Sequence, residues 1–143
     1  MKGHRMHLDH VGLSVADLEA MTRWYCDTLG LRESAPFTID AIGLRGTFVI
    51  GDDGFAIELL EREGSQPGLQ APDTATALLT RGYGHIALRI ADVEGTHAAL
   101  LAAGASERMP PQQSPEAGVR MSFVADPEGN LIELLDRSGA VGS

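Results

Sequence analysis

An internal repeat, in which similar residues recur 75 positions apart, is the feature that most limits how this chain can fold. Its most informative members are two histidines and two glutamates, with 48 residues from each His to the following Glu: His10, Glu58, His85 and Glu133. Two imidazoles and two carboxylates are enough to ligate one divalent cation. The duplication therefore suggests two modules that fold back on one shared metal site.

The repeat also predicts the domain organisation. The aligned segments are residues 10–19 with 85–94, 48–49 with 123–124, and 54–60 with 129–135. We expect one domain over residues 1–143, with module one at about residues 7–62, a linker at about 63–82 and module two at about 83–137. A chain of 143 residues that is 43% hydrophobic can bury one good core, or two small modules that share one.

Each module reads as a strand, a helix and three strands, which predicts an α+β fold of two tandem βαβββ units. Residues 8–15 alternate between apolar and polar side chains, as a half-buried strand does. Asp17 is expected to cap a helix that ends at Gly30, and Asp92 and Gly104 are expected to do the same in module two. The apolar residues at helical spacing in the first helix, expected to face its core, include Trp24 and Tyr25.

Two stretches interrupt the repeat. Residues 63–74 are rich in Gly, Pro, Ser and Gln and predict a linker, with a short helix at 75–79. Residues 106–118 contain three prolines and predict a long loop inside module two. Such a loop is either a lid or binding loop, or a mobile surface insertion.

The alternation along the strands places the four ligand candidates on one side of each module. Glu58 lies between Ile57 and Leu59, and Glu133 lies between two apolar residues in the same way, so each carboxylate points away from the apolar face. Taken singly, each of these residues is best explained as an ordinary strand residue facing water. Four of them at repeat-related positions favour a shared site, because a carboxylate in the middle of a sheet is costly unless it is paired or metal-bound.

Composition excludes several function classes. The formal net charge of −9 argues against binding of a nucleic-acid backbone. The single cysteine, Cys26, cannot form an internal disulfide and fits a reducing compartment. No apolar run approaches the roughly 20 residues that span a bilayer, and no signal-type stretch follows the N-terminus, so we expect a cytoplasmic protein without a membrane partner.

Several polar residues other than the four ligand candidates can be explained without a metal site. Three histidines lack a repeat partner and are expected at the surface: His4, His7 and His97. Arg62 and Arg137 are repeat mates beyond the Glu strands and are expected to be solvated strand ends, although either could hold an anionic substrate. Arg89, two residues past His85 on the same strand face, is the better candidate for binding a carboxylate or phosphate.

Three stretches of this sequence resemble one known superfamily: Asp9-His10-Val11-Gly12-Leu13-Ser14-Val15, Gly84-His85-Ile86-Ala87-Leu88 and Asp126-Pro127-Glu128-Gly129-Asn130-Leu131-Ile132-Glu133-Leu134. This is the vicinal oxygen chelate superfamily, and the resemblance runs from about His7 to Arg137. It implies two βαβββ modules that form a cupped mixed sheet around a metal. Members include glyoxalase I, methylmalonyl-CoA epimerase, extradiol dioxygenases and antibiotic-resistance proteins, so the resemblance specifies the fold more strongly than the reaction.

The pattern of ligands is most similar to that of glyoxalase I, which uses His, Glu, His and Glu. These map onto His10, Glu58, His85 and Glu133 in order. Extradiol dioxygenases use two His and one Glu, and bleomycin-binding proteins usually lack the ligands. Both stay open as alternatives, the first as an oxygen-using enzyme and the second as a small-molecule-binding resistance protein.

Two positions depart from bacterial glyoxalase I, where an Arg and an Asn help to hold glutathione. Here the matching residues are Ser14 and Arg62, which become candidates for substrate binding together with Arg89. The stretch at residues 73–79 resembles methylmalonyl-CoA epimerase instead. That family, however, has Gln where Glu58 stands and a second catalytic carboxylate on the strand that here covers residues 44–48.

The resemblance implies a metal-dependent lyase or isomerase that transfers a proton next to a metal-chelated carbonyl. The implied cofactor is one divalent metal ion, among Zn, Ni, Co, Mn and Fe. Glu133 is the first candidate for the base and Glu58 its repeat-related partner, with His10 and His85 as ligands only. The expected partner is a small molecule with two neighbouring oxygens, and the expected assembly is a homodimer.

Overall fold

The computed structural model describes residues 4–142 and divides the chain into two compact units, Met1–Gln66 and Pro67–Ser143. The first unit contains β1 (Val11–Ser14), α1 (Leu18–Leu29), β2 (Arg32–Ile39), the 3₁₀ turn η1 (Asp40–Ile42), β3 (Leu44–Ile50) and β4 (Ala56–Arg62). The second contains α2 (Thr74–Ala77), β5 (His85–Arg89), α3 (Val93–Ala102), β6 (Ser106–Gln113), β7 (Arg120–Ala125) and β8 (Leu131–Asp136). The boundary between the units falls inside the predicted linker.

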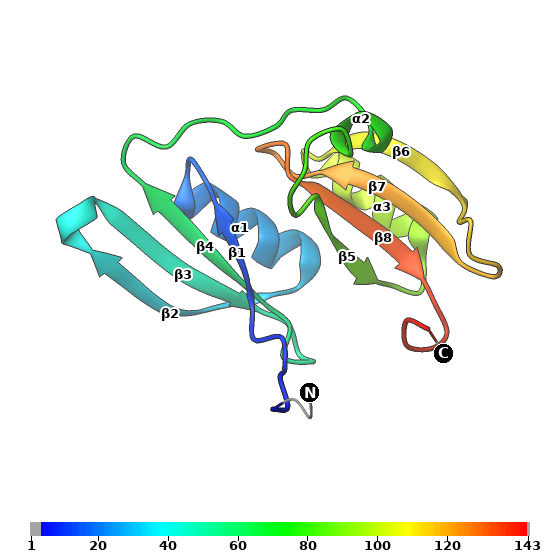
Figure 1. Cartoon of the computed structure of the whole chain (residues 1–143), viewed down its shortest axis with the longest axis horizontal. Helices are drawn as coiled ribbons and strands as arrows, with labels where there is room; N and C mark the ends of the chain where they lie inside the picture. Colours follow the sequence, from blue (N-terminus) through cyan, green and yellow to red (C-terminus); the bar gives the residue numbers. More distant parts are fainter. Residues whose placement is uncertain (1–3, 143) are drawn as a thin grey trace. The chain divides into compact units, whose positions relative to one another are not determined.

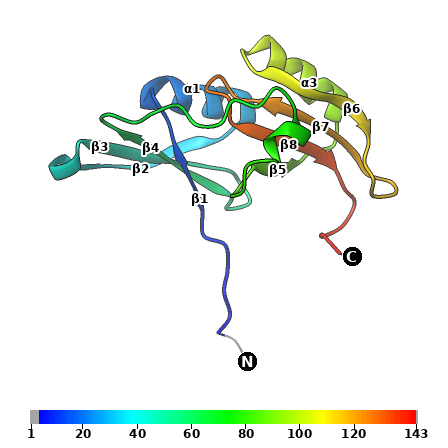
Figure 2. The same ribbon diagram turned by 45° about the horizontal axis from the view of Figure 1, so that its top comes forward.

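The two units have the same sheet topology. Each has four strands, ordered β1-β4-β3-β2 in the first and β5-β8-β7-β6 in the second (Figure 1). The first strand of each unit pairs in parallel with the last, and the remaining pairs are antiparallel. One long helix packs against one face of each sheet, α1 in the first and α3 in the second (Figures 1 and 2). The prediction of an α+β fold with two βαβββ modules is therefore confirmed.

Helix α1 begins and ends where the sequence predicts. Asp17 has an extended backbone, and its side chain accepts a hydrogen bond from the Ala20 N–H at 2.9 Å, which satisfies one of the unpaired donors of the first turn. Gly30 ends the helix with a left-handed backbone at φ 66°. Trp24 and Tyr25 are buried, as expected, and pack edge to face with ring centroids 4.9 Å apart.

The apolar face of each sheet lies under its helix. Ile57 and Leu59 in β4, and Ile132 and Leu134 in β8, are all less than 2% exposed. Glu58 and Glu133 stand between these residues, so their side chains leave the opposite face of each sheet. The predicted separation of core and polar faces is therefore present in both units. Strand β1 is shorter than the predicted 8–15, because its pairing with β4 starts at Val11.

The prediction of a long loop at residues 106–118 is wrong. Residues 106–113 form strand β6, which ends before a short turn at 114–118. Pro110 and Pro111 are tolerated because β6 is an edge strand that pairs only with β7, and because both lie in the register shift between Met109 and Gln112, where neither is part of a ladder pair. Its register also shifts near Met109. The repeat mate β2 is again an edge strand, with Pro36 beside a register shift.

The expectation that His97 lies at the surface is also wrong, whereas His4 and His7 are exposed as predicted. His97 is 4% exposed on the inner face of α3, with its Nδ1 2.9 Å from the Ser122 hydroxyl and its Nε2 2.8 Å from the Glu107 carboxylate. Val93 and Leu100, four residues before it and three residues after it, are buried with it. Helical spacing therefore places this polar side chain in the core, where two partners satisfy it.

Among residues 4–142, no helix is long and apolar enough to cross a membrane.

Candidate metal-binding site

The first unit brings His10 and Glu58 together. In the parallel pairing of β1 with β4, Gly12 stands opposite Glu58, and His10 precedes Gly12 by two residues on the same face. The Nε2 atom of His10 lies 3.5 Å from Oε1 of Glu58. Gly12 lies beside the pair, since a Cβ there would be 3.8 Å from the same carboxylate oxygen, an ordinary van der Waals contact.

The second unit repeats this arrangement with His85 and Glu133. Ala87 stands opposite Glu133 in the parallel pairing of β5 with β8, and His85 precedes Ala87 by two residues. The Nε2 atom of His85 lies 3.2 Å from Oε1 of Glu133. Each unit thus brings one imidazole nitrogen close to one carboxylate oxygen, at repeat-related positions.

Phenylalanines fix the two imidazoles from the side, a feature that sequence reasoning missed. Phe48 pairs with Glu58 across β3 and β4, and its ring meets His10 edge to face at 5.2 Å. Phe123 pairs with Glu133 and meets His85 in the same way at 5.0 Å. The signal was in the repeat, because these two phenylalanines align without a gap.

Module one carries a second aromatic ring on the same face. Phe37 lies directly over Gly46, where a Cβ would come 2.4 Å from the ring, and its centroid is 6.4 Å from that of Phe48. The repeat mates of Phe37 and Gly46 are Gln112 and Met121. The surface beside His10 is therefore more aromatic than the surface beside His85.

The separation within each pair fits two ligands of one metal ion. Ligands held about 2.0–2.2 Å from a cation, at angles between octahedral and tetrahedral, lie about 3 to 3.5 Å apart. The observed separations are 3.5 Å for His10 with Glu58 and 3.2 Å for His85 with Glu133. All four side chains are between 18% and 35% exposed, so they are accessible to an ion and partly shielded from water. Imidazole and carboxylate donors suit Zn, Ni, Co, Mn and Fe.

The two histidines differ in their outer hydrogen bonds. The Nδ1 atom of His10 lies 2.7 Å from Oδ2 of Asp9. This hydrogen bond, with a smaller contribution from the charge of Glu58, raises the pKa of His10 above its usual value against the opposing effect of partial burial. The residue before His85 is Gly84, which has no side chain to play this part.

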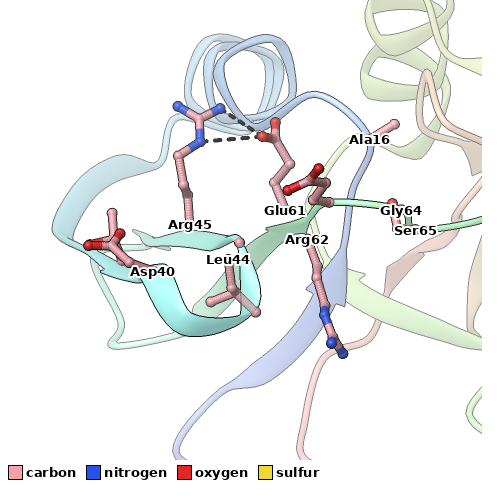
Figure 3. Close-up of a pocket in the computed structure, with 11 residues that line it drawn as sticks. Ala16, Asp40, Leu44, Arg45, Glu61, Arg62, Gly64 and Ser65 are labelled. Atoms are coloured by element: carbon pink, nitrogen blue, oxygen red, sulfur yellow. Dashed lines mark hydrogen bonds and ion pairs between the residues drawn. The ribbon is translucent and has the colours of Figure 1, made fainter.

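The three substrate-binding candidates are exposed and share faces with the ligand pairs: Ser14, Arg62 and Arg89. Ser14 follows His10 by four residues, and Arg89 follows His85 by four. Arg62 leaves β4 on the opposite side from Arg45 and Glu61, at the edge of a pocket of about 600 Å³ (Figure 3). Its repeat mate Arg137 is instead bound to the Glu116 carboxylate. Arg62 is thus the freer of the two cations.

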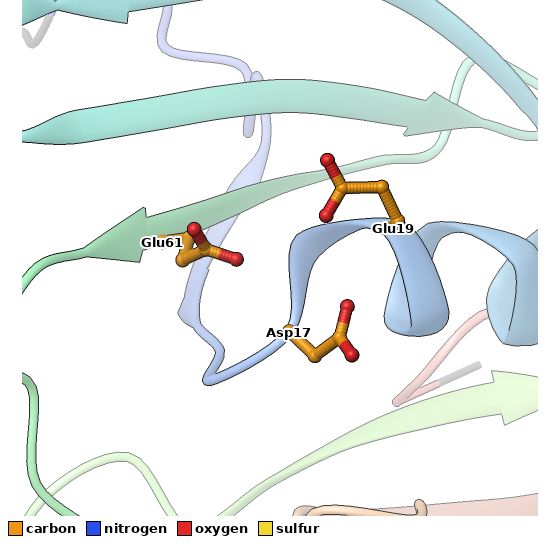
Figure 4. Close-up of side chains that lie close together, drawn as sticks. All are labelled: Asp17, Glu19 and Glu61. Atoms are coloured by element: carbon orange, nitrogen blue, oxygen red, sulfur yellow. The ribbon is translucent and has the colours of Figure 1, made fainter.

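A group of three carboxylates on the helix side of the first sheet resembles a metal site only in composition: Asp17, Glu19 and Glu61 (Figure 4). The guanidinium of Arg45 binds Glu19 at 2.6 Å and Glu61 at 2.8 Å. Glu61 also accepts the Leu18 N–H at 2.8 Å. These contacts tie the start of α1 to the sheet, and Asp17 caps the same helix, so each carboxylate has a structural role that needs no cation.

Comparison with known proteins agrees with this fold. A probable lactoylglutathione lyase from Synechocystis sp. is 29% identical over 140 residues, covering 93% of this chain and 97% of that protein. One from Vibrio parahaemolyticus is 27% identical, covering 92% of this chain and 91% of that protein. A glyoxalase family protein from Bacillus cereus superposes with a TM-score of 0.76 at 20% identity, covering 96% of this chain and 98% of that one.

Glyoxalase I from Zea mays has the same fold, with a TM-score of 0.74 at 20% identity. The match covers 92% of this chain but only 45% of the maize chain, so this protein spans less than half of that enzyme. The family model that matches residues 7–134 covers most of the sequence and both His–Glu pairs. On this match and the repeated βαβββ topology, the chain belongs to the Glyoxalase/Bleomycin resistance protein/Dioxygenase superfamily.

Proposed function

We propose that this protein is a metal-dependent lyase or isomerase of the glyoxalase I type, which moves a proton next to a metal-chelated carbonyl. The observation that carries this proposal is the pair of matching His–Glu arrangements, each on the open face of its sheet. The names of the two curated relatives, both probable lactoylglutathione lyases, support the same reaction class.

The proposed metal ligands are His10, Glu58, His85 and Glu133. Because each unit supplies only two of them, a complete site requires the two pairs to face each other, within one chain or between the chains of a homodimer. A divalent ion bound there would act as a Lewis acid on two neighbouring oxygens of the substrate.

Glu133 is the proposed base. Its carboxylate would take the proton from the carbon beside the carbonyl and return it to the neighbouring carbon, or to the other face of the same carbon. Glu58 occupies the repeat-related position and could serve the opposite face of a substrate. Phe48 and Phe123 would keep the two imidazoles from rotating, because each ring edge is already in contact.

The cationic side chains suggest an anionic substrate. Arg62 and Arg89 are exposed on the ligand faces and are proposed to bind a carboxylate or phosphate of a small molecule, with Ser14 as a hydrogen-bonding group. Phe37 and Phe48 add an apolar surface beside His10. A small anionic metabolite and the single thiol of Cys26 both fit the cytoplasmic location that we propose.

Metal analysis followed by a turnover screen tests this function. The purified protein is reconstituted with each candidate metal, and then assayed on hemithioacetals, acyl-CoA epimers and catechols. We expect bound divalent metal and turnover of a carbonyl substrate without oxygen consumption. Oxygen uptake with iron would instead favour an extradiol-type dioxygenase, and tight metal-independent binding without turnover would favour a resistance protein that binds small molecules.

A further inference from the structure

The carboxylate of Asp9 contacts the Nδ1 edge of the His10 ring, on the side turned away from Glu58. Oδ2 of Asp9 lies 2.7 Å from Nδ1 of His10, while Nε2 on the other side of the ring lies 3.5 Å from Glu58. A third contact, the edge-to-face packing on Phe48, restrains the plane of the ring. The imidazole is therefore held at three points, and only one of them is a ligand candidate.

A neutral imidazole carries its proton on one nitrogen, and the other nitrogen has the lone pair that can bind a metal. An ionised carboxylate accepts hydrogen bonds but cannot donate one. When His10 is neutral, the contact with Asp9 therefore requires the proton to be on Nδ1, which leaves the lone pair on Nε2, beside Glu58. Carboxylates that contact a metal-binding imidazole in this way fix both its tautomer and its orientation.

Module two lacks a carboxylate that contacts its histidine in this way. Gly84 stands where module one has Asp9, and within residues 4–142 no hydrogen bond reaches Nδ1 of His85. The contacts of His85 with Phe123 and Glu133 are otherwise the same as those of His10. The repeat is thus symmetric in its ligands and asymmetric in the groups that orient them.

We infer that Asp9 is a positioning residue, which holds His10 in the Nδ1–H tautomer and so presents Nε2 to the proposed metal. The inference rests on the proposed function for the metal, and it adds that the two halves of the repeat are unequal. Because Asp9 is 91% exposed, its effect belongs to the histidine tautomer and not to the stability of the fold.

The test compares four single variants with the wild type. Asp9→Ala removes the acceptor, and Asp9→Asn keeps an oxygen that can accept from Nδ1–H. Asp52→Ala is the control, because it removes the same charge from an exposed turn of the same unit. Gly84→Asp adds the missing carboxylate to module two, where a side chain would meet no atom within 4 Å.

Two readouts are measured on each protein without any assay of activity. The first is the tautomer of His10 and His85 in the metal-free protein, from ¹⁵N chemical shifts of the neutral rings. The second is Zn²⁺ affinity, from competition with a chelator. We expect Asp9→Ala to populate the Nε2–H form of His10 and to weaken Zn²⁺ binding by about tenfold. Asp9→Asn should retain much of the wild-type tautomer and Zn²⁺ affinity, and Asp52→Ala should change neither quantity. Gly84→Asp should shift His85 towards the Nδ1–H tautomer.

The two readouts separate the inference from the proposed function. An Asp9→Ala protein with the wild-type tautomer and wild-type affinity would overturn the positioning role even if the metal site is correct. A tautomer that depends on Asp9 in a protein that binds no Zn²⁺ would support the positioning of His10 and overturn the proposed metal site.

Discussion

Glu133 is the residue whose replacement best separates chemistry from ligation. In Glu133→Gln the amide oxygen can still approach a metal, but the side chain can no longer accept a proton at neutral pH. We expect turnover to fall by about 10² to 10⁴ while much of the metal is retained. The measurement is turnover and solvent-deuterium exchange at the substrate carbon, with metal content determined on the same samples. Glu58→Gln is the comparison, and undiminished exchange in metal-loaded Glu133→Gln would remove Glu133 as the base.

His97, which has no histidine at the repeat-related position, stabilises the fold through its buried contacts. His97→Ala would leave the fully buried hydroxyl of Ser122 without this partner and open a cavity under α3. We expect a loss of about 2 to 4 kcal/mol in the free energy of unfolding, measured by urea titration. His7→Ala, at an exposed position, is the control and should change stability little. Equal stability of the two variants would contradict the role assigned to the buried contacts.

At the scale of elements, an arginine on the third strand ties the helix start to the sheet in each unit. Arg45 binds Glu19 and lowers the pKa of that carboxyl, and its repeat mate Arg120 does the same to Glu94. A lowered pKa means that the stabilisation is complete above the unfolded pKa of about 4.5 and is lost as the pH falls through the folded value. Arg45→Met should therefore lower the urea midpoint slightly at pH 7, and the gap to the wild type should close at acidic pH.

Arg32→Met, at an exposed position on β2, is the control for this pH experiment. A gap between Arg45→Met and the wild type that persists or widens well below pH 4.5 would show that the pairing of Arg45 with Glu19 is not its source. The effect is expected to be small, because all of these side chains are exposed to solvent and screened by salt.

The elements also show which parts of the fold sequence could predict. Helix α1 was predictable because its start and end depend on local chemistry, the Asp17 cap and the left-handed Gly30. Strand β6 was not, because two prolines exclude a central strand but not an edge strand, and edge position is a property of the whole sheet. In the same way, repeat spacing pointed to each His–Glu pair, whereas the part played by Asp9 appears only when its carboxylate is placed in space.

At the scale of the whole molecule, the division of the ligands between two units makes the assembly testable. A chain with His10→Ala and Glu58→Gln keeps only the ligands of module two, and a chain with His85→Ala and Glu133→Gln keeps only those of module one. If the site forms between the chains of the expected homodimer, a heterodimer of these two proteins contains one complete set of ligands and one set that is fully disrupted. If the site forms within one chain, neither chain of the heterodimer has a complete set.

If the site forms across the interface, the heterodimer, purified through two different affinity tags, should bind about one divalent ion with an affinity near that of the wild type, because one four-ligand set is restored there. Each double variant alone should bind metal weakly, which serves as the internal control. A metal-poor heterodimer, or a wild-type protein that is monomeric by light scattering and fully loaded with metal, would place all four ligands in one chain. Either result decides whether the duplicated modules serve their own chain or the neighbouring one.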